Sequence, residues 1–161
     1  MINFDKLYNF AKNFQNKNKI MKKKGSKCDF ILSRNENLKR EFFARLGKNK
    51  RSISDVIAAV SSVGADRFYI SEERAFMAIK RFHELQTSER PCLPADFPWI
   101  RNPEKRKMLC EIYERVKKRM EESPGLSLKD AVYEVVNSPA PAFYLTRCSI
   151  RTILYKYLSS C

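Results

Sequence analysis

Apolar residues recur along this chain at the three- and four-residue spacing of amphipathic helices, in segments separated by glycine, proline, serine and threonine. After Ser52, for example, Ile53, Val56, Ile57 and Val60 follow the i, i+3, i+4, i+7 pattern of a buried helix face. The pattern predicts an all-α protein, with helices over residues 34–46, 53–62, 72–86, 103–121, 128–138 and 147–159.

A second pattern is an internal repeat, in which residues 52–82 resemble residues 127–157 without a gap, 75 positions later. Each copy has a serine cap, an apolar helix stripe, a break at glycine or proline, a Phe-Tyr pair and a second serine or threonine cap. Duplication is the favoured interpretation, and chance similarity between two amphipathic hairpins is the alternative. The identical positions are Ser52 and Ser127, Asp55 and Asp130, Val60 and Val135, Ala65 and Ala140, Phe68 and Phe143, and Tyr69 and Tyr144.

Together the helices and the repeat predict two tandem three-helix units, residues 29–90 and residues 102–161, joined by a linker over residues 91–101. The linker is rich in proline, and we expect its aromatic residues Phe97 and Trp99 to pack against the units. The two Phe-Tyr pairs are expected to fill the core in the same way.

Ser33 with Glu36 predicts a capping box at the start of the first helix. Three short helices ending in a polar third helix resemble the plan of helix-turn-helix DNA-binding units. The connection over residues 63–70 is longer than the usual three or four residues of that motif, so the resemblance concerns architecture alone.

Charge points to a partner, because the 161 residues carry a net charge of +14. Residues 1–28 form a basic N-terminal tail, in part of helical spacing, with eight lysines against one aspartate. Lysine-rich arms bind phosphate backbones through salt-sensitive counterion release, although the codon bias of an AT-rich genome gives the same composition. Met21 and the lysines after it also resemble a translation start, so the first twenty residues need not belong to the natural product.

Three basic clusters are therefore candidate phosphate contacts: the tail, the segment after residue 46 and the last helix. The last helix is purely basic and adds Ser149, Thr152 and Tyr155 as hydrogen-bonding groups, whereas the helix over 72–86 is mixed in charge. Ordinary decoration of a surface helix is the alternative for these cations. The predicted nucleic-acid-binding residues are Lys22, Lys23, Lys24, Lys48, Lys50, Arg51, Arg147, Arg151 and Lys156.

Catalytic chemistry has little support in the sequence. The five cysteines are odd in number and form no CxxC pair, His83 is the single histidine, and neither a Gly-rich phosphate loop nor a metal-binding motif is present. We therefore expect no enzyme activity, no cofactor and no metal. No apolar run reaches the roughly 18 residues of a membrane-spanning helix, and no signal peptide is evident, which predicts a cytoplasmic protein.

The favoured function is that of a non-enzymatic nucleic-acid-binding protein, a regulator or accessory factor with DNA as the preferred form. The alternative is an adaptor or structural assembly protein that binds an acidic protein partner. DNA against RNA, sequence specificity, oligomeric state and biological process are open at this point.

Overall fold

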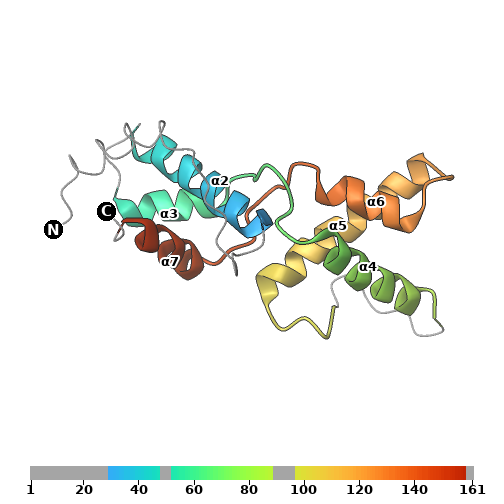
Figure 1. Cartoon of the computed structure of the whole chain (residues 1–161). Coiled ribbons are helices and arrows are strands. Elements are labelled where there is room, and N and C mark those ends of the chain that lie inside the picture. Colours follow the sequence, from blue (N-terminus) through green and yellow to red (C-terminus); the bar gives the residue numbers. More distant parts are fainter. Residues whose placement is uncertain (1–28, 48–51, 89–96, 159–161) are drawn as a thin grey trace.

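The computed structural model describes residues 29–47, 52–88 and 97–158, and these residues form six helices with one isolated β-bridge and no strand (Figure 1). The all-α prediction is confirmed. None of the described helices is long and apolar enough to cross a membrane. The helices are α2 (Asp29–Leu46), α3 (Ile53–Ser61), α4 (Glu72–Gln86), α5 (Pro103–Glu122), α6 (Leu128–Val136) and α7 (Arg147–Leu158).

The helices begin where side chains satisfy the free amides of the first turn. The hydroxyls of Ser52 and Ser127 accept hydrogen bonds from the backbone amides three residues later, at 3.2 Å and 3.1 Å. Asn102 caps α5 directly before Pro103, and Thr146 accepts from the amide of Ser149 at 3.1 Å. The caps that the sequence predicted at Ser52, Ser127 and Thr146 are confirmed.

The predicted start of the first helix is wrong. In the structure α2 already includes Asp29, so Ser33 and Glu36 lie inside the helix and form no capping box. The added turn contains Phe30, which is partly buried against the hydrophobic core. Packing of the Phe30 ring stabilises the helix at positions that precede the predicted cap at Ser33.

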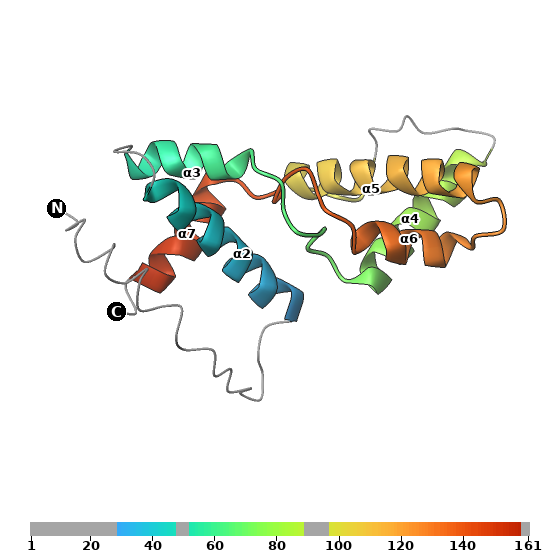
Figure 2. The same ribbon diagram turned by 90° about the horizontal axis from the view of Figure 1, so that it is seen from above.

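The six helices form two three-helix lobes that lie end to end (Figures 1 and 2). In the first lobe α3 packs against α2 and α7, and in the second lobe α6 packs against α5 and α4. This grouping differs from the tandem units expected from the chain order, in which α4 would join α2 and α3. The third helices are exchanged, because the chain crosses between the lobes at residues 62–71 and again at residues 137–146.

The two connections meet each other at the centre of the molecule. Ala65 and Ala140 exchange backbone hydrogen bonds of 2.9 Å and 3.0 Å. Phe68 stacks on Tyr144 with ring centroids 6.1 Å apart, and Tyr69 stacks on Phe143 at 6.2 Å. The two connections are therefore paired with each other at the point where the chain crosses between the lobes.

Close approach and side-chain contacts fix this junction. A Cβ atom at Gly64 would lie 3.2 Å from the carbonyl oxygen of Ala140, which favours glycine there. From α2, Arg40 donates to both carboxylate oxygens of Asp66 at 3.0 Å. From α5, Arg115 donates to the carbonyl oxygen of Pro139 at 2.7 Å. One arginine of each lobe therefore holds one connection.

Aromatic side chains fill the second lobe and the junction. Phe68 and Phe97 are fully buried, and the ring of Phe97 stacks on Phe82 at 4.2 Å. Trp99 is half-buried and meets the ring of Phe97 edge-on at 5.6 Å. The predicted core packing of the linker aromatics and of the Phe-Tyr pairs is confirmed.

A prediction about pH follows from Tyr144, the one non-glycine residue with positive φ (52°) among the described residues. Burial, reinforced by the charges of Glu111 and Glu104, raises the pKa of its phenol from 10.0 to about 12. The folded state thus favours the neutral phenol, so this contribution to stability is complete below pH 10 and is lost as the pH rises toward about 12.

We expect Tyr144→Phe to lessen the decline in the free energy of unfolding over that alkaline range, as measured by denaturant titration. Tyr155→Phe, at an exposed position of α7, is the control and should follow the wild-type curve. A Tyr144→Phe curve parallel to wild type would contradict the assignment.

Candidate nucleic-acid interface

Helix α7 is held in the first lobe by its inner face. Ile150 and Leu154 are buried against the core, and α7 contacts both α3 and α2. The hydroxyl of Tyr157 accepts a hydrogen bond from the buried Asn35 side chain at 3.4 Å, and the Lys39 ammonium lies 3.9 Å from the centroid of the Tyr157 ring. These contacts fix the rotation of α7 and therefore determine which of its residues face outward.

The outward face of α7 is cationic and carries no acidic residue. Arg147, Arg151 and Tyr155 follow one another at four-residue intervals, so they form one stripe along the helix. All three are exposed, and Tyr155 is 41% exposed, which is unusual for a large aromatic side chain. We call the exposed residues of this helix the α7 face: Arg147, Cys148, Arg151, Thr152, Tyr155 and Lys156.

The arginines of the α7 face differ from the eight cations of the described residues that form ion pairs. Neither Arg147 nor Arg151 has an ion-pair partner within the described part of the chain. Elsewhere in the described residues, eight cations lie beside a carboxylate, whereas others, such as Lys105 and Lys129, have no ion pair. Such pairs are Lys39–Glu36, Arg40–Asp66, Arg45–Glu41, Lys80–Glu84, Lys107–Glu104, Arg115–Glu111, Lys118–Glu122 and Arg119–Glu134.

Helix electrostatics do not explain this arrangement. Arg147 is the first residue of α7, and a positive charge there is unfavourable because the amino end of a helix is itself partly positive. By contrast α4, the helix that follows the other crossing connection, begins with Glu72 and Glu73, as helix stability favours. Arg147 therefore stands where the fold alone would favour an acidic residue.

The sequence-predicted site is only partly described by the structure. Arg147, Arg151 and Lys156 all lie on the α7 face, as expected for a surface that contacts a ligand. Of the additional hydroxyl groups, Thr152 already donates to the carbonyl oxygen of Cys148 at 2.9 Å, and Ser149 is half-buried, which leaves Tyr155 as the most accessible. Outside the described residues lie Lys22, Lys23, Lys24, Lys48, Lys50 and Arg51.

The described residues contain no candidate metal centre. No group of three His, Cys, Asp or Glu side chains gathers there in a way that could hold a metal ion. His83 is half-buried on α4, with its ring 6.4 Å from the ring of Tyr113.

No protein-family model, curated protein or solved structure matches this chain. Its function is therefore inferred from its own residues and their geometry.

Proposed function

We propose that this protein is a non-enzymatic nucleic-acid-binding protein, a regulator or accessory factor that contacts duplex DNA through the α7 face. The observation that carries the proposal is the pair Arg147 and Arg151, exposed one helical turn apart without a carboxylate partner in the described part of the chain. Arginine presents a planar fork of donors that suits phosphate oxygens and the edge of guanine.

The geometry of α7 suits a helix that enters the major groove. Its inner face is fixed to α2 and α3, so the outer side chains are presented on a rigid support. Two arginines and Lys156 supply phosphate contacts, and Tyr155 adds a hydroxyl and an aromatic ring beside them. The three-helix first lobe supports such a helix even though α7 arrives from the far end of the chain.

The basic segments outside the described residues extend the same proposal. Lys48, Lys50 and Arg51 fall in the sequence between α2 and α3, the two helices that hold α7. With the lysines of residues 1–28, they add sequence-independent phosphate contacts whose strength falls with salt.

We also infer that the two lobes arose by internal duplication. Residues 75 positions apart occupy matching places: Ala65 pairs with Ala140, and each phenylalanine of one Phe-Tyr pair stacks on the tyrosine of the other. In that case α4 and α7 are equivalent helices whose outer faces have diverged. The acidic start of α4 and the basic start of α7 support a division of roles between the lobes.

The test is the double variant Arg147→Ala with Arg151→Ala, measured by fluorescence anisotropy on labelled duplex DNA, single-stranded DNA and RNA over a salt series. We expect duplex affinity to fall by about tenfold or more and the slope of log affinity against log salt to become smaller by about 2. The slope should change because two phosphate contacts are lost.

The matched control is Lys118→Ala with Lys129→Ala, which removes the same charge from exposed positions of the second lobe. This control should retain nearly all of the affinity. An unchanged slope in the α7 variant, or an equal loss in the control, would overturn the assignment to α7.

A further inference from the structure

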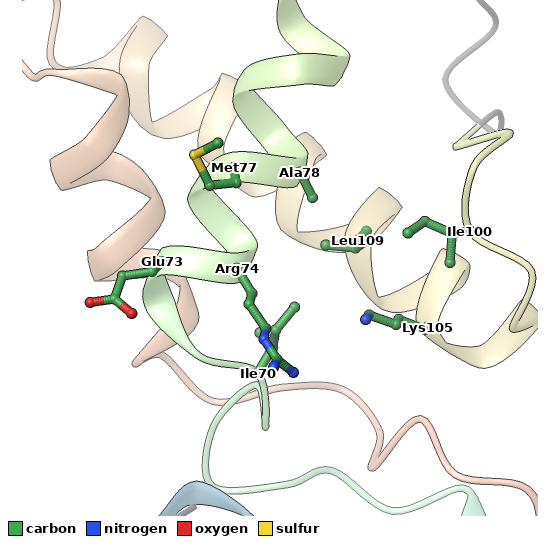
Figure 3. A pocket seen from close by; sticks show the side chains of 8 residues that line it. All are labelled: Ile70, Glu73, Arg74, Met77, Ala78, Ile100, Lys105 and Leu109. Carbon is green, nitrogen blue, oxygen red and sulfur yellow. The ribbon is translucent and has the colours of Figure 1, made fainter.

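A shallow apolar groove of about 360 Å³ lies between α4 and α5 in the second lobe, on the part of the molecule remote from α7 (Figures 1 and 3). Ile70, Ala78, Ile100 and Leu109 form most of its apolar lining. They come from the connection after α3, from α4, from the segment before α5 and from α5 itself. The groove is therefore built by packed elements of the fold.

Two cations lie at one end of this groove. Figure 3 shows the guanidinium of Arg74 beside Ile70 and the ammonium of Lys105 across from it on α5, while Glu73, which also lines the groove, directs its carboxylate away from both cations. Neither cation has an ion-pair partner among the described residues. This end of the groove is therefore complementary to a carboxylate.

Met77 makes the same surface unusual in its apolar exposure. This side chain also lines the groove and is 64% exposed. It is the more exposed of the two large hydrophobic side chains that lie on the surface of the described residues. At the corresponding position of α7, 75 residues later, the chain has Thr152. Flexible methionine side chains commonly occur at surfaces that receive apolar groups from a partner.

We propose that this groove, lined by Ile70, Met77, Ala78 and Leu109 with Arg74 and Lys105 at its end, binds an acidic amphipathic segment of a partner protein. An apolar side chain of the partner occupies the groove, and a carboxylate one helical turn away pairs with the two cations. A nucleic-acid backbone would leave the apolar lining uncovered, so a peptide is the better match. The groove does not depend on the α7 face, and the protein can hold both ligands at once.

The probe is a fluorescein-labelled peptide of about four helical turns, with leucine at the i, i+3, i+4, i+7 positions and glutamate elsewhere. Its counterpart carries lysine in place of each glutamate. By anisotropy we expect the acidic peptide to bind the wild-type protein and the basic peptide not to bind. Arg74→Glu with Lys105→Glu should weaken the acidic peptide by at least about tenfold, and Met77→Ser by roughly three- to tenfold.

Lys118→Glu with Lys129→Glu is the matched control, because it makes the same change in net charge elsewhere on the second lobe. This control should keep most of the peptide affinity, as should Arg147→Ala with Arg151→Ala. A result that rejects DNA binding by the α7 face therefore leaves the test of peptide binding in the groove intact. Circular dichroism checks that each variant is folded.

Three peptide-binding results would each overturn the proposal: no binding of the acidic peptide to wild type, equal binding by wild type and the charge-reversed groove variant, or equal binding of the acidic and basic peptides. Sedimentation tests a second copy of the chain as the occupant. A wild-type dimer that Met77→Ser converts to monomer would assign the groove to self-association and reject the acidic partner.

Discussion

Replacing Ile150 with alanine is expected to destabilise α2 and α3, about 90 to 120 residues earlier in the chain, while leaving its sequence neighbours α5 and α6 nearly unchanged. Ile150 is fully buried on α7, and α7 packs in the first lobe. Shortening a buried isoleucine to alanine costs about 2–5 kcal/mol. This loss of stability should affect the helices that contact α7, which are α2 and α3.

Hydrogen exchange followed by mass spectrometry measures this effect helix by helix. A loss of about 2–5 kcal/mol corresponds to roughly 30-fold or more in the exchange of amides that open with the first lobe. The matched variant is Ile79→Ala, since Ile79 is equally buried on α4. It should accelerate exchange in α5 and α6 and spare α2 and α3.

The two variants together test the exchange of helices between the lobes. If α4 belonged with α2 and α3, and α7 with α5 and α6, the two patterns of exchange would be reversed. A reversed pattern would therefore contradict the arrangement of the lobes. A uniform increase in the rate of hydrogen exchange along the chain would contradict the expectation that the two lobes unfold separately.

Features set by nearby residues were predictable from the sequence. The caps of α3 and α6 need one serine hydroxyl and one amide three residues later, and the stripe Ile53, Val56, Ile57 and Val60 needs only helical periodicity. Three of these four side chains are buried in the structure. Local chemistry of this kind acts within a few residues, so the spacing records it directly.

The grouping of the helices was not predictable in the same way. A connection of about ten residues, such as 62–71, is long enough either to return to its own unit or to cross to the other, and the apolar periodicity of each helix does not distinguish the two. The choice depends on contacts between segments 75 residues apart, such as the Ala65–Ala140 bridge. The two Phe-Tyr pairs are visible in the sequence as matching positions of a repeat. That match does not indicate that the two pairs contact each other, as they do in the structure.

Much of the candidate site was predictable because the charge of a helix can be read directly from its residues. The absence of acidic residues in α7 is visible in the sequence, and the structure adds that Arg147 and Arg151 share an exposed face. The groove at Arg74 and Lys105 could not be found in this way, since its lining comes from α4, α5 and two connections that meet only in the folded chain.

The second large effect is expected at the junction, where Phe68→Ala should reduce the free energy of unfolding by about 3–5 kcal/mol. Phe68 is fully buried, its ring stacks on Tyr144, and the guanidinium of Arg115 lies 5.2 Å from the ring centroid. Removing the ring leaves a cavity between the two connections, so contacts from both lobes are lost together.

Differential scanning calorimetry should show a lower melting temperature, by on the order of 10 °C for a chain of this size. It should also show a broader or split transition, because the lobes then unfold with less coupling. Phe76→Ala is the control: this aromatic residue lies half-buried on α4 and away from the crossing, and its loss should cost less without splitting the transition.

The inferred duplication adds a sharper expectation, because Phe143 occupies the equivalent position in the second connection and stacks on Tyr69. Phe143→Ala should then destabilise the protein to within about 1 kcal/mol of Phe68→Ala, since the two rings fill matching sides of one junction. If Phe143→Ala had only the small effect of the Phe76 control, the junction would depend on one connection alone. The symmetric role of the two Phe-Tyr pairs would then be rejected, while the exchange of α4 and α7 would still be decided by the hydrogen-exchange pattern.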